Sequence, residues 1–367
     1  MHVGRVGAHS CAPLRRVNFQ KRDAQVLIAF FVAIYARSLF FLVEVVRFGI
    51  RSLTRLYQFE FRPYRRPFKR ALFTSHGKWD VREGIILRLT DETGRVGWGE
   101  IAPISWFGSE TLEQAWKFCQ QLPPQITAET IFSIPAELPA CQFGFESAWE
   151  WGESSHSKIA YSCLLPAGEA ALESWQTAWN QGHRTFKWKI GIATIEDELK
   201  VFNQLIQALP ASAQLRLDAN GGLNRQEANH WLRVSDEAGI IEFLEQPLPP
   251  KQFDAMLEMS TPYSTPIALD ESVATLDQLE DCYQRGWRGI FVIKAAIAGS
   301  PKRLRQFCQK YDIDIVFSSV FESAIARQAA LKLAAELSHT NRAVGFGVNH
   351  WFNEDDENWI ERLWNSP

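Results

Sequence analysis

The sequence predicts an α/β protein in which a barrel of parallel strands follows a smaller α+β domain. Five short apolar runs in the second half of the 367-residue chain end at positions 189, 218, 245, 270 and 294, so neighbouring ends are 24 to 29 residues apart. One strand, one helix and their loops take about 30 residues, which matches this spacing. The segments between the runs carry apolar residues three or four positions apart, as helices do. Alternating strands and helices predict a parallel sheet.

Eight strands are expected in the barrel. Five are the apolar runs themselves, at 186–189, 215–218, 240–245, 267–270 and 290–294. Short runs of β-branched and aromatic residues are typical of buried strands. A first strand is expected at 158–164, and the seventh and eighth at 314–319 and 343–347. The sequence therefore predicts a TIM-like barrel over about 158–347, within a catalytic domain of 151–347.

Helices are expected between the strands, each with a residue in front that can cap it. The expected pairs are Thr194 before 195–209, Asn224 before a helix through Leu232, Thr275 before 276–283, and Ser300 before a helix from Pro301 through Phe307. Ser, Thr and Asn side chains accept hydrogen bonds from the first free N–H groups of a helix. Pro is favoured in the first helical turn.

Residues 56–150 have a different pattern and are expected to form an α+β domain. Strands are expected at 56–61, 84–89 and 96–100, with a hairpin turn at 91–94, and helices at 112–119 and 143–151. The short alternating runs around a turn are typical of antiparallel strands. This segment is too short to be half of a barrel.

The first 55 residues fit neither domain. Their uninterrupted apolar run covers 26–36 and is shorter than the roughly 18 residues expected of a membrane span. The alternatives are a signal anchor, an organellar targeting segment or an amphipathic surface helix. The interpretation we favour is an upstream extension from a misassigned start codon, with the folded protein beginning near Leu56.

The composition is that of a soluble enzyme with a small-molecule substrate. The net charge is −3, which argues against a nucleic-acid partner because no basic footprint is present. The six cysteines form no C-x-x-C pair, which fits a reducing compartment and predicts a cytoplasmic protein. No membrane partner is expected for the catalytic part of the chain.

Charged residues at the ends of the strands are the strongest functional signal. They are Lys187, Lys189, Asp218, Glu245, Asp270 and Lys294. A buried strand has no ordinary reason to end in an unpaired charge, because desolvating a charge is costly. The carboxyl ends of barrel strands are where catalytic groups lie in TIM-like barrels. Three carboxylates there can hold a divalent cation such as Mg²⁺, and ammonium groups can flank it.

The ordered set of motifs resembles the enolase superfamily, in its muconate-lactonising subgroup. The matching residues are Lys187-x-Lys189, Asp218-Ala219-Asn220, Glu245-Gln246-Pro247, Asp270-Glu271-Ser272 and Lys294. The segment Gly97–Pro103, with Phe107 and Glu110, resembles the capping-domain motif of that subgroup's dehydratases in menaquinone and phylloquinone biosynthesis. The resemblance covers about 56–360. It implies a modified TIM barrel of the (β/α)7β type with an N-terminal α+β capping domain, on which the C-terminal segment 348–367 packs.

The resemblance also implies a role for each charged residue. Asp218, Glu245 and Asp270 would hold Mg²⁺ or Mn²⁺. Lys189 would be the base that removes a proton beside a carboxylate, with Lys187 orienting and tuning it. Lys294 would remain charged on the opposite face and stabilise the enediolate by a cation–π interaction. The cation would act as a Lewis acid for the charge that develops.

Supporting residues are expected around this set. Arg216, Asn220 and Glu271 are expected to position the ligands. Candidate substrate contacts are Ser318, Ser319, Trp106 and Phe107, although the serines can equally form a hydrogen-bonded rim and the two aromatic residues can equally pack the domain interface. His350 is expected to be an ordinary rim residue.

The expected reaction is Mg²⁺-dependent dehydration of a cyclohexadiene carboxylate. Racemisation of N-succinyl amino acids, dipeptide epimerisation and muconate lactonisation are the alternatives within the superfamily. Dipeptide epimerases usually carry an Asp-x-Asp pair after the eighth strand, but residues 345–350 contain no such pair, which argues against an amine-bearing substrate. A non-catalytic barrel scaffold is the alternative of a different class. It predicts at least one lost catalytic residue, and all six are present.

Overall fold

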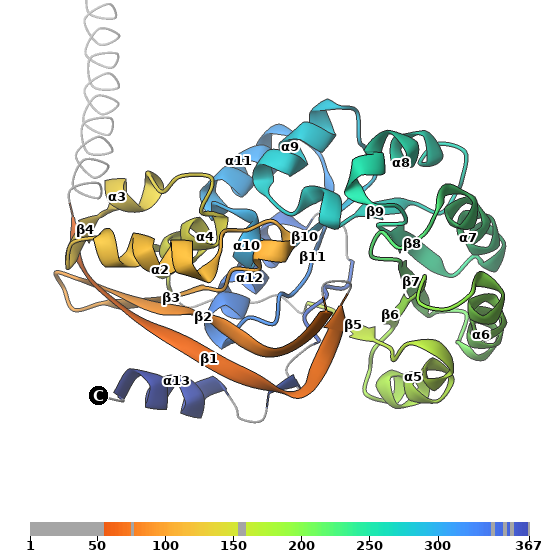
Figure 1. The fold of residues 1–367 in the computed structure, drawn as a ribbon, viewed down its shortest axis with the longest axis horizontal. Helices are drawn as coiled ribbons and strands as arrows, with labels where there is room; N and C mark the ends of the chain where they lie inside the picture. Colours follow the sequence, from red (N-terminus) through yellow and green to blue (C-terminus); the bar gives the residue numbers. More distant parts are fainter. Residues whose placement is uncertain are drawn as a thin grey trace, which may run out of the picture. The chain divides into compact units, whose positions relative to one another are not determined.

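Two sheets organise the protein, whose computed structural model describes residues 55–74, 77–152, 159–338, 342–347, 351–352 and 356–365. An antiparallel sheet has the strand order β3-β2-β1-β4, and a parallel sheet has the order β11-β10-β9-β8-β7-β6-β5 (Figure 1). The antiparallel strands are β1 (Leu56–Thr74), β2 (Gly77–Asp91), β3 (Val96–Ile101) and β4 (Gln125–Thr127). The expectations for residues 1–54 and for His350 lie outside the described residues.

The parallel sheet follows the order of the chain, as a barrel requires. Its strands are β5 (Ser162–Leu164), β6 (Thr185–Lys189), β7 (Gln214–Asp218), β8 (Ile241–Glu245), β9 (Ile267–Leu269), β10 (Ile290–Ile293) and β11 (Asp314–Phe317). Each strand pairs in parallel with the next. The parallel sheet that the spacing of the apolar runs predicted is therefore confirmed.

The eighth strand is a correction, because 343–347 forms two isolated bridges and not a regular strand. Val344 bridges Tyr161 ahead of β5, and Gly345 bridges Ser318 after β11. The Ser162 amide donates to the Val344 carbonyl at 2.9 Å, and the Gly345 amide donates to the Phe317 carbonyl at 2.8 Å. These hydrogen bonds join the two outer strands of the parallel sheet, so the barrel closes through a short irregular segment.

Helices cover the outside of the parallel sheet, and Figure 1 shows α5 to α8 along the outer side of β5 to β9. The barrel helices are α5 (Ala171–Asn180), α6 (Ile195–Ala208), α7 (Arg225–Ala238), α8 (Phe253–Met259), α9 (Leu276–Gln284), α10 (Ala295–Ala298), α11 (Pro301–Lys310) and α12 (Ala324–Leu337). The side chains of Thr194, Asn224, Thr275 and Ser300 each accept a hydrogen bond at the start of their helix. The four predicted caps are confirmed.

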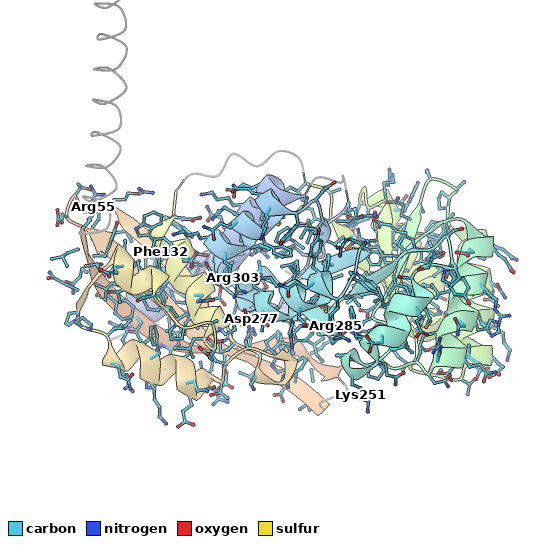
Figure 2. All side chains as sticks on the ribbon, turned by 90° about the horizontal axis from the view of Figure 1, so that it is seen from above. Arg55, Phe132, Lys251, Asp277, Arg285 and Arg303 are labelled. Atoms are coloured by element: carbon cyan, nitrogen blue, oxygen red, sulfur yellow. The ribbon has the colours of Figure 1, made fainter. Side chains whose placement is uncertain are left out.

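Ion pairs between neighbouring barrel helices lie at the surface. Arg303 on α11 pairs with Asp277 on α9 at 2.5 Å, and Arg285 after α9 pairs with Asp254 on α8 at 2.7 Å (Figure 2). Exposed pairs of this kind contribute little to stability, typically about 0–1 kcal/mol. The stability of the barrel therefore depends on its apolar core and not on these contacts.

The antiparallel sheet is built on a hairpin much longer than predicted. β1 and β2 pair from Tyr57 opposite Asp91 to Thr74 opposite Gly77, with a shift of register between Pro67 and Leu72. Proline lacks an N–H donor and favours such irregular positions, so two prolines made the strand look shorter than it is. The tip of the hairpin carries Phe68 and Trp79, whose rings are 5.2 Å apart.

The helices beside the antiparallel sheet are α2 (Leu112–Gln121), α3 (Ala128–Phe132) and α4 (Pro139–Trp149). Two glycines of β3 let it approach α4 closely. A Cβ atom at Gly97 would lie 2.0 Å from the Ala148 carbonyl oxygen, and one at Gly99 would lie 2.0 Å from the Gly144 carbonyl oxygen. The Gly-Trp-Gly sequence therefore serves packing between strand and helix.

The last described helix, α13 (Asp356–Asn365), packs on the antiparallel sheet. Its Trp359 ring is 5.0 Å from Tyr64 on β1, and its Trp364 ring is 4.7 Å from Trp98 on β3. The residues from Arg55 onward form one compact unit, so the division into capping domain and barrel near residue 150 stays a prediction. Within the described ranges, no helix is both long and apolar enough to cross a membrane.

Glu100, the first acid of the capping motif, links the antiparallel sheet to the barrel. The Ser323 amide at the start of α12 donates to both carboxylate oxygens of Glu100, at 2.9 and 3.1 Å, and the Ser323 hydroxyl donates to the same carboxylate. The Tyr64 hydroxyl donates to it at 2.5 Å. A carboxylate at a helix N-terminus satisfies free N–H groups and interacts favourably with the helix dipole.

Two further contacts dock α4 on α11. The Glu146 carboxylate accepts a hydrogen bond from the Lys302 amide at 2.9 Å, and the Gln142 side-chain oxygen accepts one from the Ser300 amide at 3.1 Å. Both acceptors meet the first turn of the helix. Two barrel helices, α11 and α12, thus begin against polar side chains of the residues before 150.

We expect Glu100→Gln to lower the free energy of unfolding by about 1–3 kcal/mol, because a neutral amide replaces the charged acceptor of buried donors. Urea unfolding measures the change. Glu113→Gln is the matched control, because Glu113 lies on α2 in the same part of the chain and forms an exposed ion pair with Lys117, at 2.6 Å. The control should match the wild type. Equal stability of Glu100→Gln and wild type would show that this contact does not hold the two parts together.

Candidate active site

The six predicted charged residues meet at one end of the barrel. Lys189 is the last residue of β6, Lys187 lies two residues before it, and Asp218 is the last residue of β7. In the strand ladder Lys189 lies opposite Asp218, and Asp218 lies opposite Glu245 at the end of β8. Asp270 directly follows β9, and Lys294 directly follows β10. Five neighbouring strands thus bring these charges to the same end of the sheet.

The three carboxylates are buried and contact ammonium groups. Asp218, Glu245 and Asp270 are only 3%, 2% and 3% exposed. The Lys187 ammonium lies 2.9 Å from Asp218 Oδ2 and 2.6 Å from Glu245 Oε1. The Lys294 ammonium pairs with Asp270 Oδ1. Each buried acid therefore has a positive partner.

Burial and mutual repulsion act on the pKa values of these groups. Burial, with repulsion from Asp218, raises the pKa of Glu245 to about 7, and burial raises the pKa of Asp270 to about 6. For Asp218, burial is outweighed by Lys187 and Lys189, so its pKa is lowered. The pKa of Lys187 is raised despite its burial, because Asp218 and Glu245 favour the charged form.

The donor set fits a divalent metal ion. Carboxylate oxygens are hard ligands of the kind that Mg²⁺ prefers. Glu271 Oε2 is buried nearby and has no hydrogen-bond partner among the described residues. Among the residues that the structure describes, no three Asp, Glu, His or Cys side chains are already arranged so that they could hold a metal ion together. Lys187 and Lys294 explain this, because their ammonium groups contact the oxygens that a cation would take.

Asn220 connects Lys189 to Glu271, as expected of residues that support the site. The Lys189 ammonium donates to Asn220 Oδ1, and Asn220 Nδ2 donates to Glu271 Oε1 at 3.0 Å. The Asn220 backbone is left-handed, with φ of 44°, and its amide donates to Asp218 Oδ1 at 3.2 Å. Asn tolerates this conformation better than most residues. The turn after β7 therefore orients both a carboxylate and a lysine.

Gln246 is a supporting residue that the sequence prediction missed. Its side-chain oxygen accepts hydrogen bonds from the amides of Asp270 (2.9 Å) and Ser272 (3.2 Å). Its side-chain nitrogen donates to Ser272 Oγ at 2.7 Å and to the Leu248 carbonyl at 2.9 Å. Gln246 is fully buried and has φ of 38°. The signal for it was a polar residue between a strand end and a proline.

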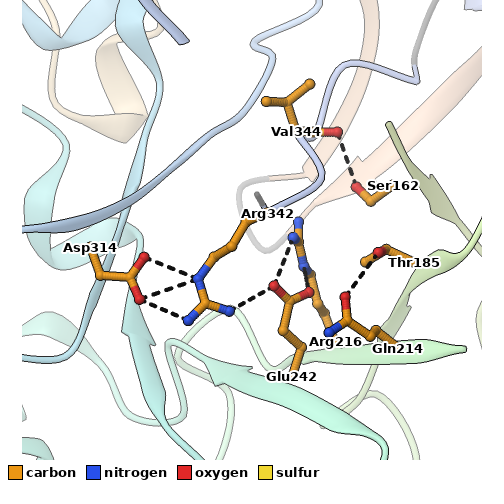
Figure 3. A network of polar contacts seen from close by, with 8 residues as sticks. All are labelled: Ser162, Thr185, Gln214, Arg216, Glu242, Asp314, Arg342 and Val344. Carbon is orange, nitrogen blue, oxygen red and sulfur yellow. Dashed lines mark hydrogen bonds and ion pairs between the residues drawn. The ribbon is translucent and has the colours of Figure 1, made fainter. Parts of the chain in front are cut away.

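Arg216 requires a correction, because its guanidinium hydrogen-bonds to Glu242 and not to a candidate ligand. Arg216 Nε lies 2.7 Å from Glu242 Oε2. Arg342 joins the network with ion pairs of 2.7 Å to Glu242 and 2.7 Å to Asp314 (Figure 3). Glu242 and Asp314 lie near the starts of β8 and β11. Arg216 therefore holds the opposite end of the barrel together.

The candidate substrate contacts differ in where they lie. The Ser319 hydroxyl is engaged within its own loop, donating to Glu322 at 2.9 Å and accepting from the Phe321 amide at 2.9 Å. Ser318 forms the bridge that closes the barrel. Trp106 is 40% exposed and packs against Trp79. Phe107 reaches the charged cluster, where it contacts Lys294.

Phe107 contacts Lys294 directly. The Lys294 ammonium lies 4.1 Å from the centre of the Phe107 ring, a distance typical of a cation–π interaction. Phe107 belongs to a short 3-10 helix, Ser105–Phe107, in the segment before residue 150. The capping motif thus brings an aromatic ring to the barrel site.

Glu110 of the same motif is structural. Its carboxylate accepts hydrogen bonds from the amides of Ala140 (3.0 Å) and Cys141 (2.8 Å) in the first turn of α4. Burial raises the pKa of Glu110. Glu110 and Glu100 therefore both act as helix caps, which accounts for two acids of the motif without catalysis.

Two family profiles and several known proteins match this chain. The profile of a family described as "Enolase C-terminal domain-like" matches residues 170–362, and one described as "MenC, N-terminal domain" matches residues 54–151. The chain is 44% identical over 305 residues to the o-succinylbenzoate synthase of Thermosynechococcus vestitus, which covers 80% of this chain and 93% of the relative. It is 24% identical over 312 residues to the L-Ala-D/L-Glu epimerase of Bacillus subtilis, covering 76% of this chain and 84% of the epimerase.

Solved structures agree with the sequence relatives. The crystal structure of o-succinylbenzoate synthase from Thermosynechococcus elongatus, complexed with Mg in the active site, matches with a TM-score of 0.78 and 43% identity, covering 84% of this chain and 100% of that one. A dipeptide epimerase from Enterococcus faecalis, complexed with Mg and a dipeptide, matches with a TM-score of 0.70 and 19% identity over 82% of this chain and 93% of that one. The second similarity concerns the fold alone.

We expect Lys187→Met to bind Mn²⁺ about tenfold more tightly or better, because the ammonium competes with a cation for Asp218 and Glu245. Two charges about 4 Å apart interact by about 4 kcal/mol near a protein surface, and a tenfold change needs about 1.4 kcal/mol. Calorimetric or electron paramagnetic resonance titration measures the affinity. Lys200→Met removes an exposed lysine on α6 that pairs with Asp197 at 2.9 Å and should change nothing. Unchanged or weaker binding by Lys187→Met would contradict the competition.

Proposed function

The chain belongs to the o-succinylbenzoate synthase family of the enolase superfamily, and from this premise we propose that it is a hydro-lyase that forms 2-succinylbenzoate. The substrate is 2-succinyl-6-hydroxy-2,4-cyclohexadiene-1-carboxylate, and the reaction belongs to menaquinone or phylloquinone biosynthesis. The observation that carries the proposal is the complete set of three carboxylates and three lysines at one end of the barrel. The 44% identity to a synthase, against 24% to an epimerase, favours dehydration over epimerisation.

The metal requirement follows from the chemistry of the substrate. Removing the proton beside the carboxylate adds a second negative charge to an anion. Mg²⁺, held by Asp218, Glu245 and Asp270, supplies the Lewis acidity that this charge needs. The same cation balances the repulsion among the three buried acids, which otherwise depend on Lys187 and Lys294.

Lys189 is the group best placed to act as the base. Its ammonium is oriented by Asn220, whereas the Lys187 ammonium lies against the carboxylates of Asp218 and Glu245. Neutral Lys189 takes the proton from the carbon beside the carboxylate, and a carbon–carbon double bond forms as the hydroxyl leaves. The resulting ammonium of Lys189 returns the proton to the leaving hydroxyl, which departs as water. The ring becomes aromatic, and no further reactant is needed.

Lys294 lies across the cluster, after β10, and contributes a fixed positive charge. Its partners are Asp270 and the Phe107 ring. A cation next to the substrate ring stabilises the negative charge that spreads into it. Lys189 therefore transfers the proton, and Lys294 stabilises the negative charge.

Location and domain division are part of the same proposal. The described cysteines, Cys119, Cys141, Cys163, Cys282 and Cys308, are free thiols, which supports a reducing, cytoplasmic location. We assign 56–150 to a capping domain and 151–347 to the catalytic barrel. The packing of α13 on β1 and β3 supports a C-terminal segment that returns to the capping domain.

We expect the purified protein to convert the cyclohexadiene substrate in the presence of Mg²⁺ and to lose that turnover when EDTA removes the metal. Adding Mg²⁺ or Mn²⁺ back should restore it. Formation of the aromatic product is followed by ultraviolet absorbance. Full turnover after metal removal would contradict the metal role. No turnover under any condition, together with rapid racemisation of N-succinyl amino acids, would overturn the substrate assignment.

We expect Lys189→Ala to reduce kcat by about a hundred- to ten-thousandfold, since general base catalysis contributes about 10²–10⁴ and no neighbour can replace it. Circular dichroism and Mn²⁺ affinity should stay as in the wild type. Lys251→Ala, at a surface lysine in the loop after β8 (Figure 2), is the control and should retain full activity. A near-normal rate for Lys189→Ala would mean that another group is the base.

A further inference from the structure

We propose that Phe107 is a positioning residue for Lys294, holding its ammonium at the site through a cation–π contact when the metal has taken the carboxylate of Asp270. This inference rests on the proposed function, in which Lys294 stabilises charge on the substrate. It assigns Phe107 a lysine as its partner, where the sequence left open a contact with the substrate or packing at the domain interface.

The Lys294 ammonium has one charged partner and one neutral aromatic partner. One is the Asp270 carboxylate, and the other is the face of Phe107, at 4.1 Å from the ring centre. The Lys294 side chain is 14% exposed, so the contact is largely shielded from water. A lysine ammonium has three N–H donors, and these two partners leave a further donor for a substrate.

Binding of a metal makes the aromatic partner more important. Asp270 is a proposed ligand, and a divalent cation on its carboxylate weakens the attraction for Lys294. The side chain of lysine is long and flexible, so an ammonium without a partner gains entropy by leaving the site. The Phe107 face is neutral and is unaffected by the metal charge. It therefore keeps the ammonium in place in the loaded enzyme.

The turn that carries Phe107 lies close to a loop of the barrel. Within the turn, the Ser109 hydroxyl accepts a hydrogen bond from the Ile104 amide at 2.7 Å. Gly108 has φ of 127°, and a Cβ atom there would lie 3.0 Å from Cβ of Ala274 in the loop after β9. The glycine therefore lets the turn approach the barrel loop that carries Asp270.

A chain of aromatic rings supports the turn from the opposite side. Phe107 is 6.1 Å from Trp106, Trp106 is 5.7 Å from Trp79 at the hairpin tip, and Trp79 is 5.6 Å from Phe321. Phe321 has φ of 60°, a conformation that is rare for a bulky residue, and its amide donates to Ser319 at 2.9 Å. Rings from the loop after β11, the hairpin and the capping turn thus form a chain that ends at Phe107, which Trp106 contacts.

The first test compares two leucine variants. Phe107→Leu should lower kcat about five- to thirtyfold, the range that a partly desolvated cation–π contact supports, with KM within about twofold of wild type. Phe132→Leu is the matched control, because the Lys302 ammonium lies 4.5 Å from the Phe132 ring, also between the segment before 150 and a barrel helix (Figure 2). The control should keep the wild-type kcat. A normal kcat for Phe107→Leu would overturn the proposal.

The second test separates the electrostatic effect from packing. Replacing Phe107 by phenylalanines with one, two and three ring fluorines weakens the negative face of the ring stepwise with little change of shape. We expect log kcat to fall with each fluorine at position 107 and to remain constant with the same series at position 132. A flat series at 107 would mean that the ring only fills space. This test remains valid if Phe107→Leu does not fold.

The third test needs no turnover. In ¹³C-lysine-labelled, Mg²⁺-loaded protein, the ε-methylene signal of Lys294, assigned with Lys294→Arg, should be shifted upfield by the Phe107 ring and should lose that shift in Phe107→Leu. An equal signal in both proteins would overturn the positioning role. If the wild type fails to dehydrate the cyclohexadiene but the shift is present, the proposed function fails and the contact stands.

Discussion

Three carboxylates buried side by side create the constraint on which the rest of the site depends. Asp218, Glu245 and Asp270 end three neighbouring strands, so the sheet itself holds like charges together. Such a cluster is unstable without positive charge, because burial and repulsion both favour protonation. Lys187 and Lys294 supply part of that charge. A divalent cation supplies the rest and at the same time becomes the Lewis acid of the reaction.

Buried carboxylates outside the site have a structural role, because they accept hydrogen bonds at the starts of helices. Glu100, Glu110 and Glu146 are buried carboxylates that lack a metal role and accept hydrogen bonds from the first amides of α12, α4 and α11. Helix N-termini carry partial positive charge and free donors, so they can hold an acid without a cation. Glu100 and Glu146 therefore fix the capping segment on the barrel, while Glu110 fixes α4 within that segment, and this arrangement brings Phe107 to Lys294.

Much of this arrangement could be predicted from the sequence, because strand spacing and strand-end charges are local signals. The order Lys, Asp, Glu, Asp, Lys and the caps at Thr194 and Thr275 needed no tertiary information. The closing segment at Val344 was read as a strand because its residues suit one, but only two bridges form. Arg216 was misplaced because its partner, Glu242, comes from another strand, and no periodicity reveals which end of a barrel a side chain occupies.

A crystal soaked with Mn²⁺ and measured at the manganese absorption edge tests the central claim most directly. We predict one strong anomalous peak bounded by carboxylate oxygens of Asp218, Glu245 and Asp270, with the Lys187 ammonium moved away from its contact of 2.6 Å with Glu245. A peak elsewhere in the barrel, or no peak with Lys187 still bridging Asp218 and Glu245, would contradict the account of the three acids as a cation site.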